Sequence, residues 1–219
     1  PLIQKELDLN SQLSQYLLEQ TAKTNTLTQD ELRMRNVLDN LTQTQRTIDE
    51  QISALQGTLV LSRIIQQQKQ KLPTNLNIQG LSKQIADLRV QIFDITQKRN
   101  ELYDIDAYIS KAEQDENKSF TPAEKTQLTN LLIERRKVLS DLIKSLNNQL
   151  NLAISLELTQ QQITQISDQI QSKLDQQSFW VKSNNPINLD WFKKLPMSLK
   201  AQFDGIGKKL GFPTNFDNL

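Results

Sequence analysis

The chain contains no cysteine and no histidine, and it has few glycines, prolines and aromatic residues. Its 219 residues include 5 Gly and 6 Pro, and 5% of them are aromatic. Without Cys or His, the chain cannot build cysteine or histidine zinc sites, thiol nucleophiles, Ser-His-Asp triads or histidine bases. Because turn-forming residues are scarce, the secondary-structure elements must be long. These absences indicate an all-α protein without an enzymatic function.

Charge argues against nucleic-acid binding, and hydropathy argues against a membrane-spanning helix within this sequence. The formal net charge is +1, which argues against a strongly electrostatic nucleic-acid binder. No apolar run approaches the roughly 20 residues that span a bilayer as a helix. The chain opens with Pro1 rather than Met, so we expect a processed or excised piece. The sequence is compatible with a secretory signal before Pro1 and with a membrane span after Leu219.

Apolar residues recur at alternating spacings of three and four, the pattern of long helices packed side by side. We expect a short helix over about residues 2–21, a break in a Thr- and Asn-rich stretch that favours turns, and a long helix over about 29–71. Thr28 and Glu31 have the spacing of a capping box at the start of the long helix. The seam of this helix is interrupted only by Gln45, and upstream the same register is interrupted by Gln20, Thr24 and Glu31. Its apolar residues are Met34, Leu38, Leu41, Ile48, Ile52, Leu55 and Leu59.

Pro73 ends that helix, and two further seams follow it. One seam runs from Ile78 to Ile109 and includes Ile85 and Ile92, before a polar loop over 114–119. Thr121-Pro122-Ala123-Glu124 then predicts a helix start, with Thr as the cap, Pro at the first position and Glu at the third. This helix is expected to run to about residue 177. Its predicted core residues are Leu128, Leu132, Leu139, Leu142, Leu146, Ala153, Leu156, Ile163, Ile170 and Leu174.

The predicted fold is therefore all-α, with long, mostly antiparallel, coiled-coil-like helices. The seam over 78–109 is expected to pair with the seam over 128–174, because the loop between them is short and polar. Composition changes near residue 178: residues 179–219 contain both Trp, six Lys and three Asp. We expect a helical domain over 1–178 and, over 179–219, an aromatic and basic linker with a short amphipathic helix that leads toward a membrane domain.

The charged clusters in the sequence favour solvated helix surfaces over catalytic or ligand-binding sites. Asp104 with Asp106, and Asp115 with Glu116, are close carboxylate pairs, but a helix face and a polar loop favour a solvated surface over acid–base catalysis. The run over 135–137 is Arg-Arg-Lys, and a helix spreads consecutive residues around its axis. We therefore expect ordinary surface charge there rather than phosphate recognition. The sequence predicts no catalytic, cofactor-binding or metal-binding residue.

The junction between the helical domain and the linker carries a family resemblance. The segment over 147–154 (Asn-Asn-Gln-Leu-Asn-Leu-Ala-Ile) is followed in order by a Gln-rich helix end and an aromatic motif. The motif contains Phe179, Trp180, Ser183, Asn184, Pro186 and Trp191. Together these residues resemble the extracytoplasmic part of the large MscK/KefA-type mechanosensitive channels of the MscS superfamily.

The resemblance implies a periplasmic helical domain of a bacterial inner-membrane channel, acting as a scaffold or sensor when solutes are released during osmotic downshock. Its partners would be other copies of the subunit in a heptamer and the membrane next to its C-terminal end, with no nucleic acid and no cofactor. The implied structural or interface residues are the six motif residues and, on the seams, Ile85, Ile92, Leu142 and Leu146. The alternative is a stand-alone coiled-coil interaction or tethering protein.

Overall fold

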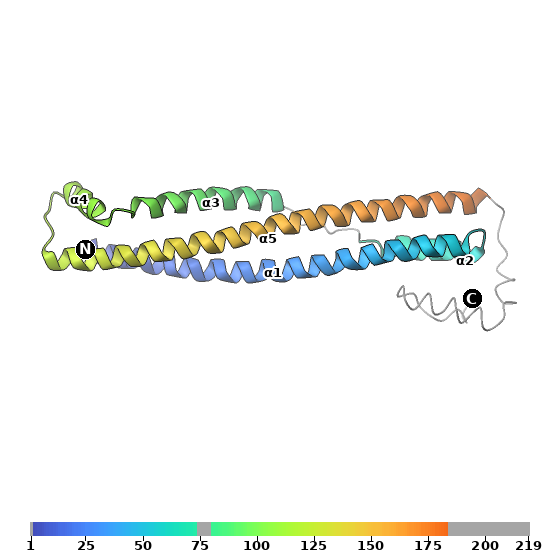
Figure 1. Ribbon diagram of the computed structural model, residues 1–219, viewed down its shortest axis with the longest axis horizontal. Coiled ribbons are helices and arrows are strands. Elements are labelled where there is room, and N and C mark those ends of the chain that lie inside the picture. The colour runs from blue at the N-terminus through green and yellow to red at the C-terminus, as the bar shows by residue number, and fades with distance from the viewer. Residues whose placement is uncertain (1, 74–79, 184–219) are drawn as a thin grey trace. The chain divides into compact units, whose positions relative to one another are not determined.

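The computed structural model describes residues 2–73 and 80–183, with side chains as far as Ser178. These residues form helices without any strand (Figure 1), so the prediction of an all-α fold is confirmed. The helices are α1 (Leu2–Leu55), α2 (Leu59–Lys71), α3 (Leu81–Glu101), α4 (Ile105–Glu116) and α5 (Pro122–Ser183).

α1 continues through the Thr- and Asn-rich stretch in which the sequence predicted a break. The hydroxyls of Thr21, Thr24 and Thr28 each donate a hydrogen bond of 2.9 Å to the carbonyl oxygen four residues earlier. These bonds satisfy the side chains within the helix, so the stretch needs no turn. The predicted break was wrong, and Thr28 is an interior helical residue rather than a cap.

The actual interruption lies at residues 56–58, inside the predicted long helix. Gly57 has a φ of +81°, a left-handed conformation that glycine adopts at little cost. The Thr58 amide and hydroxyl both donate to the Leu55 carbonyl, at 3.0 and 2.6 Å. Figure 1 shows α2 folding back from this turn.

The seam over 78–109 is likewise divided, into α3 and α4. The Leu102 amide donates to the Arg99 carbonyl at 3.0 Å, which tightens the last turn of α3. Asp104 then caps α4, because its carboxylate accepts a hydrogen bond of 3.1 Å from the Ala107 amide. Asn117, with a φ of 49°, closes α4.

The chain divides into two compact units, and α1 and α5 contribute residues to both. Among the described residues, the first unit comprises 2–34 and 80–158, and the second comprises 35–73 and 159–183. In the first unit, Leu102 and Ile109 pack with Leu128, Leu132 and Leu139 in one buried cluster. In the second unit, the buried apolar residues are Leu41, Ile48, Ile52, Leu55, Val60, Leu61, Ile65, Ile163, Ile170 and Leu174.

α5 confirms the predicted seam of the third helix. All ten of its predicted core residues are buried, and Leu142 and Leu146 are 0% exposed. Ile85 of α3 is also buried, whereas Ile92 is half-buried. The Thr121 hydroxyl accepts from the Glu124 amide at 3.3 Å, as the capping motif predicted. The helix extends to Ser183, a few residues past its expected end.

Candidate functional site

Polar side chains cross the α1–α5 contact at matched positions, and their numbering gives the direction of the two helices. In the first unit, contacts join Asn10 to Leu131, Gln20 to Gln149 and Glu31 to Ser155, at sequence separations of 121, 129 and 124. A nearly constant separation means that α1 and α5 run parallel. α3 runs antiparallel to α5, because Ser82 bonds Glu157 while Arg136 bonds the Leu102 carbonyl.

One of these contacts is centred on Arg135, which is 5% exposed. Its Nε donates to the Asn10 Oδ1 at 2.8 Å. Its terminal amino group donates to the Glu6 carbonyl oxygen at 3.2 Å and forms an ion pair with the Glu6 carboxylate. The Asn10 amide in turn donates to the Leu131 carbonyl at 2.9 Å. The buried guanidinium is therefore both paired and hydrogen-bonded, which is the condition for burying a charge without a large penalty.

A second contact joins two buried amides. Gln149 is 1% exposed and Gln20 is 2% exposed. The Gln149 side-chain amide donates to both the Oε1 and the backbone carbonyl oxygen of Gln20, each at 2.9 Å. Further along the same interface, the Ser155 hydroxyl donates to the Glu31 carboxylate at 2.9 Å. Each contact forms in one register of α1 against α5, so the set specifies the register in the way that a polar residue does in a coiled coil.

The second unit contains the same kind of contact. Gln45 donates to Gln169 at 3.0 Å, and Lys173 pairs with Asp49. α2 also takes part, because Lys69 lies 2.5 Å from the Asp175 carboxylate. The hydrogen bond from Lys69 is the main cause that lowers the pKa of Asp175, with further lowering by the Lys69 charge and by Gln171. Gln45, which interrupts the predicted seam, is thus part of a matched polar pair.

Arg135 corrects an expectation from the sequence. The run over 135–137 was interpreted as surface charge, yet Arg135 is buried, Arg136 donates to the Leu102 carbonyl and only Lys137 is exposed. The spacing of the sequence could have indicated that Arg135 is buried, because it lies three residues after Leu132 and four before Leu139, at a seam position. Gln149 likewise lies three residues after Leu146 and four before Ala153.

Between α3 and α1, the Tyr16 hydroxyl donates to the Gln91 side-chain oxygen at 3.3 Å. Partial burial raises the pKa of Tyr16, and the negative charge of Glu19 adds to this effect. The contact is partly exposed and contributes orientation rather than reactivity.

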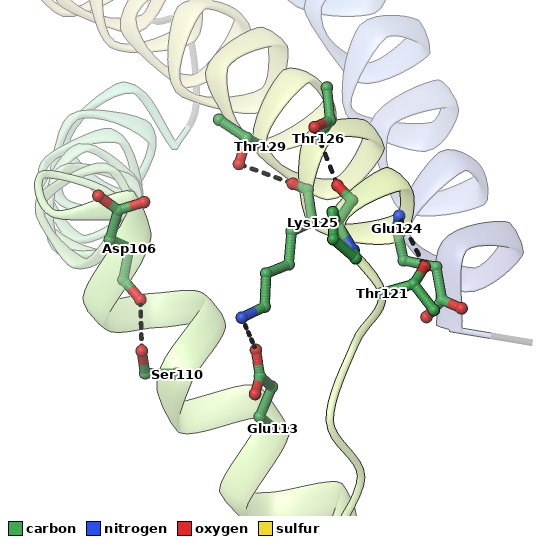
Figure 2. A network of polar contacts seen from close by, with 9 residues as sticks. Asp106, Ser110, Glu113, Thr121, Glu124, Lys125, Thr126 and Thr129 are labelled. Atoms are coloured by element: carbon green, nitrogen blue, oxygen red, sulfur yellow. Dashed lines mark hydrogen bonds and ion pairs between the residues drawn. The ribbon is translucent and has the colours of Figure 1, made fainter.

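The corner between α4 and α5 is a local network (Figure 2). Lys125 of α5 forms an ion pair with Glu113 of α4 at 3.1 Å. Ser110 donates to the Asp106 carbonyl oxygen at 2.9 Å, and Asp104 caps α4. Asp115 and Glu116 are exposed in the last turn of α4 rather than in a loop. Asp104 therefore acts as a helix cap, and Asp106, Asp115 and Glu116 face solvent.

The predicted junction residues lie largely beyond the described part of the chain. Phe179, Trp180 and Ser183 belong to the last turns of α5, so the helix continues past Trp180. The side chains of these three residues, together with Asn184, Pro186, Trp191 and the amphipathic segment over 199–210, lie outside the described residues. Their expected role stays a prediction.

No helix in the described part of the chain has an apolar stretch long enough to cross a membrane. Residues 2–73 and 80–178 also hold no group of three or more acidic side chains placed to bind a metal ion.

The chain is similar to two longer proteins, while no family model matches it. It is 82% identical over 217 residues to an uncharacterized MscS family protein of Haemophilus influenzae, covering 99% of this chain and 20% of that protein. It is 40% identical over 203 residues to the mechanosensitive channel MscK of Escherichia coli, covering 93% of this chain and 18% of that protein. The resemblance to MscK-type proteins of the MscS family is thus confirmed over nearly the whole chain, which corresponds to a segment of about one fifth of their length.

Proposed function

We propose that this chain is an extracytoplasmic helical domain of a mechanosensitive channel, located in the periplasm next to the inner membrane. In this role it is a scaffold or sensor for solute release during osmotic downshock, and it carries out no catalysis. The observation that supports the proposal most strongly is 40% identity to MscK over 93% of the chain. Copies of the domain would be brought together by association of the channel subunits, as the heptamer implied by the resemblance requires.

The polar contacts between α1 and α5 suit a domain that transmits displacement. Each residue of a helix adds 1.5 Å along the axis, so even a shift of one residue separates groups that hydrogen-bond at 2.8–2.9 Å. A buried polar group that loses its partner costs about 1–3 kcal/mol, and more where it is charged. Sliding of α5 along α1 is therefore opposed, and the two helices move together.

The junction after α5 would connect this movement to the membrane. α5 is helical to Ser183. From the sequence alone, we expect Pro186 to favour an extended conformation at the residue before it. We expect Trp180 and Trp191 to anchor the junction on either side. In the longer protein, Trp180→Ala combined with Pro186→Gly should change the membrane tension needed for opening without changing conductance. An unchanged threshold in a normally expressed double variant would show that the junction only covers the end of the helices.

The DNA sequence downstream of this segment gives the first test of the proposal. The reading frame that contains this segment should encode several hydrophobic spans soon after Leu219. A stop codon directly after Leu219 would contradict the channel assignment and favour a stand-alone coiled-coil tether.

A further inference from the structure

Buried polar atoms without a hydrogen-bond partner gather in the second unit. Among the described residues there are four such side-chain atoms: both amide atoms of Gln51, the Nε2 of Gln68 and the Oγ of Ser167. Gln51 of α1 is 4% exposed and Gln68 of α2 is 3% exposed. A buried amide without a partner has lost its bonds to water and gained none in the protein, so it weakens the contact in which it lies.

The positions of these two amides assign them to the contact between α1 and α2. Two residues turn a helix by about 200°, so Gln51 points away from Asp49, which pairs with Lys173 of α5. The third described helix of the second unit is α2, so Gln51 is buried on the side of α1 that faces α2. Gln68 lies on the buried face of α2, together with Val60, Leu61 and Ile65. The contact of α2 therefore contains three buried amide atoms that bond no described residue.

Other features of α2 also attach it weakly. It has 13 residues, a length at which a helix alone is marginal in water. No side chain caps its first turn, and the Thr58 hydroxyl donates to the Leu55 carbonyl of α1 instead. The ion pair of Lys69 with Asp175 is partly exposed, at 27% and 55% of the two side chains, and exposed pairs contribute little to stability. α2 therefore depends mainly on its short apolar face.

α1 and α5 are held to each other in the opposite way. In the same unit, Gln45 bonds Gln169 and Asp49 pairs with Lys173. Separating α1 from α5 would break contacts in which polar groups already have partners. Separating α2 from α1 would instead let water reach amides that have none, so hydration favours the release of α2 and of no other helix in this unit.

We propose that α2 detaches from α1 and α5 as a unit, pivoting at residues 56–58, while α1 and α5 stay paired. Gly57 in this connection has a φ of +81° and adopts other backbone conformations at little cost. Detachment exposes both buried amides to water and breaks the contact of α2 with Asp175, in the last turns of α5 before Ser183. The second unit thus has a closed and an open state. This inference concerns the chain itself, so its tests can fail while the channel assignment stands.

Hydrogen–deuterium exchange of the whole chain, measured by mass spectrometry on peptide fragments, detects the open state. Amides in the interior of α2 should exchange at least about tenfold faster than those of α1 and α5 in the second unit, because α2 opens without them. Amides of α2 that exchange as slowly as those over 159–173 of α5 would overturn the proposal.

Removing the unpartnered amides tests the cause of the opening. Gln51→Met combined with Gln68→Met keeps the length of both side chains without their polar ends, and should slow exchange in α2 about tenfold. Gln66→Met, the same change at an exposed position of α2, should leave exchange nearly unchanged. A double variant in which α2 exchanges at the wild-type rate or faster would contradict the proposal.

A reducible cross-link distinguishes detachment of α2 from unwinding in place. The chain has no cysteine, so Lys69→Cys combined with Asp175→Cys provides two thiols that a short, reducible bismaleimide can join. The cross-link should slow exchange in α2 to the rate of α5, and its reduction should restore fast exchange. Fast exchange that persists in the cross-linked chain would show that α2 unwinds while it stays attached, and would overturn the proposal.

Discussion

Arg135 and Glu6 form a buried ion pair although 129 residues separate them in the sequence. The side chain of Arg135 is 6% exposed and that of Glu6 is 13% exposed. The pair joins the beginning of α1 to α5 and fixes one alignment of two parallel helices. Apolar seams alone define such an alignment poorly, because a heptad pattern repeats every seven residues and packs comparably after a shift of one repeat.

Arg135→Ala should destabilise the chain by about 3–5 kcal/mol, since it leaves the Glu6 carboxylate and the side-chain oxygen of Asn10 without their donor in the protein interior. Urea unfolding followed by circular dichroism measures this loss. Lys137→Ala, two residues away on the exposed side of α5, is the matched control and should change stability little. Equal effects of the two variants would show that Arg135 is not held in the interior.

Gln149→Leu should cost about 1–3 kcal/mol, because the side-chain oxygen and the backbone carbonyl of Gln20 lose their buried donor. Adding Gln20→Leu removes one of the orphaned groups and should recover part of the loss. A double-mutant cycle of the two substitutions measures their coupling. Strictly additive effects would contradict a direct contact between these amides.

Leu142→Ala should cost about 2–5 kcal/mol, because it removes a side chain that is 0% exposed and leaves a cavity. Ile92→Ala should cost less, since Ile92 is half-buried. Ile92→Asp adds the desolvation of a charge and should exceed Ile92→Ala. Thermal melting curves of the three variants give the order. An unchanged melting temperature for Ile92→Asp would show that the α3 seam is not packed.

The Lys69–Asp175 pair should stabilise the second unit only while Asp175 is ionised. Lys69 lowers the pKa of this carboxyl in the folded chain below its ordinary value of 3.8. The unfolded chain therefore takes up the proton first as pH falls, so the contribution is complete well above pH 3.8 and is lost as the pH falls through the lowered pKa of the folded chain. Asp175→Asn should lower the unfolding midpoint in urea near neutral pH but match the wild type in strong acid, with the difference reduced by salt. Asp168→Asn, at another exposed carboxylate of α5, is the control. A difference between Asp175→Asn and the wild type that persists in strong acid would contradict the ion pair.

The apolar residues of this chain predicted its core well, and its polar residues predicted the arrangement poorly. The spacing of Leu128 to Leu174 gave every buried apolar position that was expected in α5, and Thr121-Pro122 gave its start. Gln20, Glu31 and Gln45 were treated as interruptions because a polar side chain on a seam has no visible partner within one helix. Their partners are side chains of α5 more than a hundred residues later, so only the assembled structure reveals the match.

Backbone breaks were also predicted imperfectly, for local reasons. Threonines indicate turns in a sequence, but inside α1 their hydroxyls bond the preceding turn. A single Gly57 carries a weak signal, yet its left-handed backbone ends α1. The division of α3 from α4 depends on Asp104 acting as a cap, which its place within a continuous apolar pattern concealed.

We propose that the matched polar contacts of α1 and α5 couple this domain to the pore of the longer protein. Pressure-clamp recording from membrane patches that contain the longer protein tests it most directly. Arg135→Ala should change the pressure threshold for opening, while single-channel conductance stays at the wild-type value and Lys137→Ala has no effect on either. A normally expressed Arg135→Ala channel that opens at the wild-type threshold would contradict the claim.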